Sequence, residues 1–250
     1  MRSILKRHKA FQRIVSVLFC NFTGVYINEG IAGEGTLLDL SDISGTEMYI
    51  DGPAEEEIRR RIEMTGTGEQ DGDAHDPVRN CPRLTDYRLR FLDNGNYHYM
   101  SRIFASYVKV PFDLITFDNH TDDQPPAFEG LKSCGSWRRD IAEENSCLKG
   151  SMLIRKYDDF RIGYIPSELP LYISIDKDVL SDKILNTNWD QGEMSDGQLF
   201  ELIERLMKER EIIAVDVCGE DLPQNSYEKN KEFNKAIISA FGKFEAMLQT

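Results

Sequence analysis

The sequence predicts a single α/β domain built around a parallel sheet. Three short and mainly apolar runs, at residues 112–117, 171–175 and 212–217, have the length and hydrophobicity of strands that are buried on both faces of such a sheet. Segments with a helical period separate and follow these runs. A chain of 250 residues can bury one α/β core, and its composition does not require a second. We therefore expect residues 1–250 to form one domain.

The composition argues against two classes of partner. The chain has 43 acidic and 30 basic residues, a net charge of -13, and no basic block after its first 14 residues, which argues against nucleic acid binding. No segment approaches the roughly 20 apolar residues that cross a bilayer, which argues against membrane insertion. We expect a soluble protein with a small-molecule substrate, and homo-oligomerisation stays open.

The start of the chain and the cysteines bear on location. Residues 1–14 are basic and residues 14–20 apolar, which superficially resembles a signal peptide. The apolar run is short and lacks a small-residue cleavage site, and the bulky Phe19 before Cys20 argues against a lipoprotein. The five cysteines are widely spaced and never form Cys-x-x-Cys, unlike a disulfide framework or a structural zinc site. A cytoplasmic protein is predicted.

The first part of the chain combines a strand, loops and a helix. Residues 14–19 predict the first strand, and the glycine-rich residues 21–35 predict a loop near the edge of the sheet. Pro53 precedes three glutamates and three arginines, an order that suits the first turn and the dipole of a helix. Residues 65–82 are rich in Gly, Asp and Pro and predict a mobile loop.

The later part alternates strands and helices. Residues 87–92 predict a strand, and residues 99–108 predict the helix that follows it. Ser195, with Gln198 three residues later, forms a capping box before a helix of clear period. Residues 228–248 predict a last helix, whose phenylalanine-rich face we expect to pack against the sheet.

The strand at residues 112–117 leads directly into Asp118, His120 and Asp122. Alternate side chains on an extended backbone point to one side, so these three can converge on one ion. The carboxyl ends of parallel strands are also where open α/β sheets place their sites. An isolated Asp-x-His-x-Asp is a weak signal, which becomes strong only if distant segments supply further ligands.

Two other strand ends supply such ligands. Asp176 and Asp178 follow the strand at residues 171–175 with the same alternation, and His98 follows the strand at residues 87–92, where it could also be an ordinary loop histidine. The carboxylates would repel one another and take up protons unless cations compensated them. Six ligands suit two ions about 3.5–4 Å apart, and the absence of thiolates favours manganese, with zinc, iron or cobalt as alternatives.

Three segments resemble the metal motifs of the arginase, agmatinase and histone-deacetylase superfamily. They are G-N-Y-H at residues 95–98, F-D-N-H-T-D at residues 117–122 and S-I-D-K-D at residues 174–178. Their order and strand-end positions fit, and residues 187–195 resemble the loop after the third motif. The resemblance covers residues 90–220, although the family usually has Gly-Gly-Asp-His where this chain has Gly-Asn-Tyr-His.

This resemblance implies a fold, a ligand set and a reaction. The implied fold is a three-layer α/β/α domain around a mostly parallel sheet of about eight strands. The implied ligands are Asp118 and Asp176, which bridge two manganese ions, His98 and Asp122 at one ion, and His120 and Asp178 at the other. The implied reaction is attack of a metal-bridging hydroxide on a planar carbon bonded to nitrogen, in an amide, an amidine or a guanidino compound.

The sequence departs from the family where the reaction needs other groups. Arginase-like enzymes carry a shuttle histidine after the second motif, and this chain has no histidine after His120. Gly219 aligns with the glutamate that holds a guanidinium, and Glu220 comes one residue late. Glu220, Asp190 and Glu193 are therefore the candidate general bases. Two alternatives stay open: an inactive metal-binding regulatory or scaffold protein, and a mono-metal deacetylase-like amidohydrolase.

Three side chains are candidates for contact with a substrate. Ser136 predicts the start of a helix that continues to residue 144 and contains Trp137 and Arg138. Trp189 lies in the loop after the third motif. Tryptophan rings at the mouth of a site would favour a partly apolar or cationic ligand. Packing of Trp137 and solvation of Arg138 are the competing interpretations.

Overall fold

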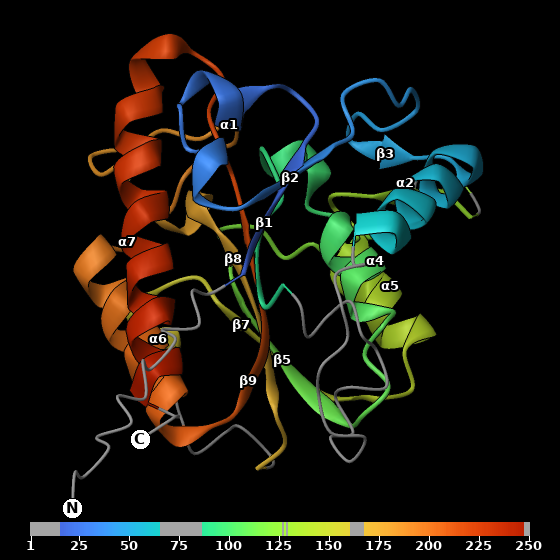
Figure 1. Ribbon diagram of the computed structural model, residues 1–250. Coiled ribbons are helices and arrows are strands. Elements are labelled where there is room, and N and C mark those ends of the chain that lie inside the picture. The colour runs from blue at the N-terminus through green and yellow to red at the C-terminus, as the bar shows by residue number, and fades with distance from the viewer. Residues whose placement is uncertain (1–15, 66–86, 127, 129, 161–167, 248–250) are drawn as a thin grey trace, which may run out of the picture.

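The computed structural model describes residues 16–65, 87–126, 128, 130–160 and 168–247. Its central element is a seven-stranded sheet in the order β2-β1-β4-β9-β8-β5-β7, and every neighbouring pair is parallel. Helices α6 and α7 lie on one side of this sheet, and α2, α4 and α5 lie on the other (Figure 1). The predicted three-layer α/β/α fold is confirmed, with seven strands in the described part of the chain where about eight were expected.

The strands β5, β8 and β9 are buried at every position, as their mainly apolar runs predict. The sheet consists of β1 (Val17–Asn21), β2 (Thr36–Asp39), β4 (Leu89–Phe91), β5 (Phe112–Phe117), β7 (Leu148–Ile154), β8 (Leu171–Asp176) and β9 (Ile212–Cys218). A separate antiparallel pair joins β3 (Tyr49–Ile50) to β6 (Lys132–Ser133). The predicted strands all occur, and β2, β3, β6 and β7 add to them.

The predicted helices also occur. They are α2 (Gly52–Thr65), α4 (Met100–Ala105), α5 (Trp137–Glu144), α6 (Asp196–Glu209) and α7 (Tyr227–Met247). The short helix α1 (Val25–Asn28) was not predicted, since it lies within residues 21–35, where a loop was expected. The capping box before α6 is formed, because the Gln198 amide donates to Ser195 Oγ and the Ser195 amide donates to Gln198 Oε1. Ser136 precedes α5 but makes no capping bond with its side chain, which donates to Asp140 instead.

Two predictions fall wholly or mostly outside the described residues. The mobile loop predicted at residues 65–82 lies outside them, apart from Thr65, which ends α2. The basic residues 1–14 also lie outside, and β1 begins at Val17. No helix in the described ranges is both long enough and apolar enough to cross a membrane.

Alternate residues of each central strand feed two hydrophobic layers. Leu114 of β5 packs with Ile103 of α4, whereas its neighbour Ile115 packs on the other face, together with Ile203 of α6 and Ile237 of α7. Both layers are closed to water, so the sheet is a rigid platform. Within the sheet, Arg90 of β4 and Asp216 of β9 form a buried ion pair, and the candidate ligands lie at the carboxyl ends of the strands.

Candidate metal centre

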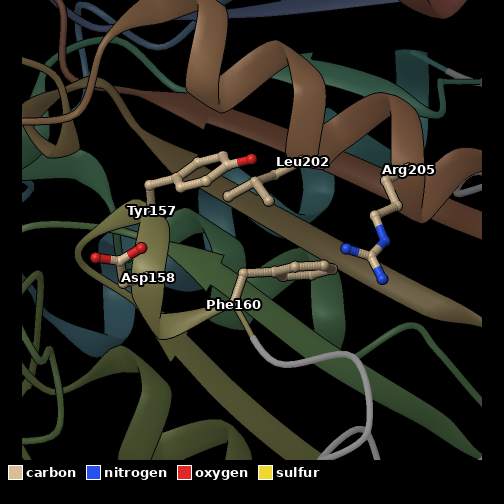
Figure 2. A pocket seen from close by; sticks show the side chains of 5 residues that line it. All are labelled: Tyr157, Asp158, Phe160, Leu202 and Arg205. Carbon is tan, nitrogen blue, oxygen red and sulfur yellow. The ribbon is translucent and has the colours of Figure 1, made fainter.

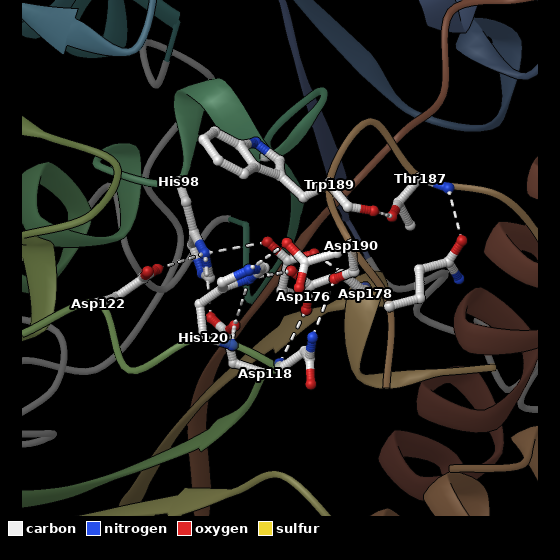
Figure 3. Close-up of polar contacts among 12 residues, drawn as sticks. His98, Asp118, His120, Asp122, Asp176, Asp178, Thr187, Trp189 and Asp190 are labelled. Carbon is white, nitrogen blue, oxygen red and sulfur yellow. Dashed lines mark hydrogen bonds and ion pairs between the residues drawn. The ribbon is translucent and has the colours of Figure 1, made fainter. Parts of the chain in front are cut away.

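All six predicted ligands meet at the carboxyl edge of the sheet (Figure 3). Because β4, β5 and β8 belong to one parallel sheet, the segments that follow them emerge on the same side. The six side chains are His98, Asp118, His120, Asp122, Asp176 and Asp178. The convergence that the sequence predicted from three separate motifs is present in the structure.

The first centre, as we name it, consists of His98 and three carboxylates. The Nδ1 atom of His98 lies 3.2 Å from Oδ2 of Asp122, 3.2 Å from Oδ2 of Asp176 and 3.5 Å from Oδ2 of Asp118. His98 and Asp118 are fully buried, and Nδ1 of the first and Oδ2 of the second lack a hydrogen-bond partner. Buried polar atoms without a hydrogen bond are costly, so these atoms fit a cation-binding site.

The second centre consists of Asp118, His120 and Asp178, whose donor atoms lie close enough to hold one ion. His120 Nδ1 lies 2.7 Å from Asp178 Oδ2 and 3.8 Å from Asp118 Oδ1. Asp118 thus turns Oδ2 toward the first centre and Oδ1 toward the second. That is the disposition of a carboxylate able to bridge two ions.

Neighbouring side chains orient the first centre. The Nε1 atom of Trp137 donates to Asp122 Oδ2 at 2.5 Å, and its ring lies 4.5 Å from that of His98. On the far side of the imidazole, Nε2 of His98 is 2.9 Å from the hydroxyl of Ser174. Ser174 stands two residues before Asp176 on β8, so the alternation used for the ligands could also have found it.

Backbone amides fix the carboxylates of the second centre. The amide of His120 donates to Asp118 Oδ1 at 2.6 Å, and the amide of Asn119 donates to Asp178 Oδ1 at 2.9 Å. The amide of Asp178 in turn donates to Asp176 Oδ1 at 3.0 Å. The loops after β5 and β8 are therefore cross-linked through the same carboxylates that would bind metal.

The crowded charges shift the pKa values of the metal-free protein. Burial, reinforced by the charges of Asp122, Asp178 and Asp176, raises the pKa of Asp118 well above its ordinary value. Burial alone would lower the pKa of His98, but the carboxylates of Asp122 and Asp176 raise it to about 10. The hydrogen bond to Asp178 raises the pKa of His120 to about 9. Without a cation, bound protons reduce the repulsion among these carboxylates. The oxygen and nitrogen donors of the cluster fit a divalent metal.

The side chain of Trp189 lies beside the second centre and is held by hydrogen bonds. The Nε1 atom of Trp189 donates to Asn96 Oδ1 at 3.0 Å, and the Gly95 amide donates to Asn188 Oδ1 at 3.0 Å. A Cβ atom on Gly95 would lie 2.5 Å from the Trp189 ring, so this position requires glycine. The Trp189 ring lies 5.8 Å from the ring of His120, edge to face. Trp189 is thus placed where a ligand of the second centre would meet it.

The three candidate bases lie in different surroundings. Asp190 Oδ1 is 3.0 Å from Nε2 of His120, and its side chain is 83% exposed (Figure 3). Glu193 is exposed on the same loop. The predicted role of Glu220 as a base needs correction. Glu220 is buried, its Oε2 lies 2.6 Å from Nζ of Lys177, and its Oε1 accepts a hydrogen bond from Asn234 of α7. Its charge is neutralised in the layer below α7, so it is not available as a base.

Two of the candidate substrate contacts need a similar correction. Trp137 is completely buried and holds Asp122, so the packing interpretation is the correct one and its ring does not line the mouth. Arg138 donates to the carbonyl of Thr121 at 2.7 Å and to Ser151 Oγ at 3.0 Å. It ties the loop after β5 to β7, and this use of its donors was not readable from sequence spacing.

Gly219, which aligns with a glutamate of the arginase family, approaches Asp176 closely. It has φ of 96°, in the left-handed region that favours glycine, and an added Cβ would lie 2.4 Å from Asp176 Oδ1. A glutamate cannot take this position without displacing Asp176. The close approach of the backbone to a metal-ligand candidate explains the glycine.

The protein also has a hollow of about 380 Å³ (Figure 2). It is lined by Tyr157, Asp158, Phe160, Leu202 and Arg205. Tyr157 donates to Glu201, and the guanidinium of Arg205 stacks over the Phe160 ring. It shares no residue with the two centres.

Comparison with known proteins shows which solved structures share this fold. No family model matches the sequence. An uncharacterized protein of Thermotoga maritima is 29% identical over 166 residues, which are 61% of this chain and 67% of that protein. Solved structures align at lower identity over nearly the whole chain. Proclavaminate amidino hydrolase from Streptomyces clavuligerus has a TM-score of 0.61 at 12% identity, covering 94% of this chain and 97% of that one. The chain has the arginase-like fold.

Two further structures of this arginase-like fold are similar over most of their length. A Trypanosoma cruzi formiminoglutamase, solved with Mn²⁺, has a TM-score of 0.57 at 12% identity and covers 91% of this chain and 93% of that one. The agmatine ureohydrolase of Thermoplasma volcanium has a TM-score of 0.56 at 12% identity and covers 99% and 96%. At such identities the likeness concerns the fold, and residue roles rest on the geometry above.

Proposed function

We propose that the protein is a metal-dependent hydrolase that cleaves a C–N bond in a small amide, amidine or guanidino compound and holds two manganese-class ions. The observation that carries this proposal is Asp118, which turns one carboxylate oxygen to each centre. The names of the similar structures, an amidino hydrolase, a formiminoglutamase and an agmatine ureohydrolase, support the same class of reaction. A cytoplasmic location and a small-molecule partner belong to this proposal.

The first centre would hold one ion through His98, Asp118, Asp122 and Asp176, and the second would hold the other through Asp118, His120 and Asp178. Two divalent cations in such a site would bring the pKa of a bound water toward about 7 and so would supply a nucleophile without serine or cysteine. The protein contributes orientation: Trp137 fixes Asp122, and Ser174 fixes His98. Preset ligands of this kind need no rearrangement when substrate arrives.

Asp190 is the best-placed group for proton transfer. Its hydrogen bond to His120 lowers the pKa of Asp190, so this carboxylate is ionised at neutral pH. Because it is exposed, it can accept a proton at the centre and release it to solvent. Asp190 would thus replace the shuttle histidine that the sequence lacks, with Glu193 as the alternative on the same loop.

The substrate class follows from what stands beside the centres. Trp189 offers an aromatic wall to an apolar or cationic group. Gly219 offers no carboxylate for a guanidinium. Amides, which are uncharged, are therefore candidates together with the cationic amidines and guanidines. An inactive metal-binding protein is the second candidate, favoured by the burial of Glu220 and the missing histidine.

The test compares manganese-loaded wild type with Asp118→Asn on a panel of ureas, guanidines, amidines and acylated amines. Wild type should hold about two ions per chain and turn over at least one compound. Asp118→Asn should hold one ion or none and be inactive, because both centres lose a ligand. Asp123→Asn is the matched control: Asp123 is exposed beside Asp122 and should leave both properties unchanged.

The outcomes separate the candidates. Two bound ions without turnover of any compound would favour the inactive metal-binding protein. A single ion together with amide turnover would favour the mono-metal amidohydrolase. Equal metal content in wild type and Asp118→Asn would remove Asp118 from the ligands and contradict the proposal.

A further inference from the structure

Cys218 ends β9 beside the first centre. In the parallel register it is paired with Asp176 of β8, and paired residues on neighbouring strands project from the same face. The Cys218 sulfur, a ring nitrogen of His98 and a carboxylate oxygen of Asp176 all lie within 4.8 Å of one another. Ligand atoms around a single ion have separations of this size, since each lies roughly 2.0–2.3 Å from the metal.

The Cys218 thiol is buried and makes one hydrogen bond. Cys218 is 1% exposed and donates a hydrogen bond to the carbonyl of Asn94, with 3.1 Å between sulfur and oxygen. Burial, followed by the charge of Asp176, raises the pKa of the Cys218 thiol and keeps it neutral in the metal-free protein. The buried Nδ1 of His98 faces the carboxylates of Asp122 and Asp176 at 3.2 Å without a hydrogen bond of good geometry to either, which is the second observation that fits an ion between these side chains.

We propose that Cys218 is a sulfur ligand of the first centre, which therefore prefers a borderline ion such as zinc or cobalt to manganese. The proposal rests on the metal site of the proposed function and specifies its chemistry. On binding, a metal–sulfur bond forms and the thiol proton passes to the buffer. Sulfur ligands select softer ions, whereas the second centre offers only carboxylates and an imidazole. The two centres thus differ in the ion that they prefer.

A sulfur ligand differs from the prediction made from the sequence. The absence of thiolates favoured manganese there, because the cysteines show no metal-binding spacing. Cys218 comes from β9, which supplies none of the six predicted ligands, so nothing in its local sequence connects it to His98. Only the strand order, with β9 between β4 and β8, brings the thiol to the centre.

The experiment is a titration of the full-length metal-free protein with Co²⁺. Bound cobalt is counted by equilibrium dialysis, and near-ultraviolet absorption reports charge transfer from sulfur to cobalt. Wild type should show this band as the first ion binds. Cys218→Ala should lose the band and bind that ion at least roughly 10- to 100-fold more weakly, since the loss of residues that only orient metal ligands already costs that much. Cys147→Ala, at another free cysteine, should behave as wild type.

Several results would overturn the assignment. Two bound cobalt ions without the band, or a band that persists in Cys218→Ala, would exclude the sulfur ligand and leave the binuclear site intact. No bound cobalt in wild type would contradict both the assignment and the proposed function. Should Cys218→Ala not fold, X-ray absorption of the zinc-loaded wild type decides: a sulfur neighbour at about 2.3 Å supports the assignment, and its absence rejects it.

Discussion

At the scale of single residues, the end of β8 divides its side chains between two polar clusters. Asp176 and Asp178 face the metal centres, and Lys177 between them is fully buried on the opposite side. Its ammonium lies 2.6 Å from Oε2 of Glu220 and 3.1 Å from Oδ1 of Asn230 in α7. A buried cation of this kind needs its partner, because desolvation of either charge alone is costly.

Lys177→Met should therefore destabilise the protein by about 3–5 kcal/mol, since it leaves Glu220 charged and buried. Chemical denaturation measures the free energy of unfolding. The double variant Lys177→Met/Glu220→Gln should recover part of the loss, because the remaining buried group is neutral. Lys208→Met, at an exposed lysine of α6, is the control and should change stability by less than about 0.5 kcal/mol. A loss below about 1 kcal/mol for Lys177→Met would contradict the account of the ion pair.

At the scale of elements, local signals set where helices begin. The capping box of Ser195 satisfies amides at the start of α6, whose buried residues Leu199, Leu202 and Leu206 pack on the sheet. Ser195→Ala should cost about 1 kcal/mol in thermal or chemical unfolding. Ser44→Ala, at an exposed serine of a surface loop, is the comparison. An equal effect of the two substitutions would show that the cap contributes nothing.

Local signals predicted the buried strands and missed the two edge strands, β2 and β7. β5, β8 and β9 were predictable because every residue in them is buried and apolar residues dominate. β7 lies at the edge and carries Lys149, Gly150 and Ser151, which interrupt its apolar pattern. Its strand character comes from pairing with β5, a tertiary effect that sequence does not show.

The same limit applies to the site. The six ligands were predictable because each follows a recognisable strand and the carboxyl ends of parallel strands meet. The surroundings were not: Trp137 and Glu220 face the interior, and Cys218 reaches the first centre through strand order. Such roles depend on which face of an element a residue occupies after the layers have packed.

At the scale of the whole molecule, metal binding replaces protons. In the metal-free protein the pKa values of His98 and His120 are about 10 and about 9, against an ordinary value of 6.5. Because both are raised by folding, their contribution to stability is complete below about pH 6.5 and is lost as the pH rises through about 9 and 10. A metal ion requires neutral imidazoles, so it competes with these protons.

We predict that the increase in Tm caused by a fixed manganese concentration grows from about pH 6 to about pH 8.5, since fewer protons must be displaced at higher pH. Differential scanning calorimetry with and without the ion measures this increase. Asp118→Asn, which lacks the shared ligand, should show a small increase at every pH. An increase that is constant or falls with pH would contradict proton displacement at the two histidines.

The central claim is that one edge of the sheet holds two ions that share Asp118. Anomalous scattering from a crystal of the manganese-loaded protein tests it most directly. We predict two peaks about 3.5–4 Å apart, one among His98, Asp118, Asp122 and Asp176 and the other among Asp118, His120 and Asp178. A single peak, or peaks away from Asp118, would contradict the binuclear centre.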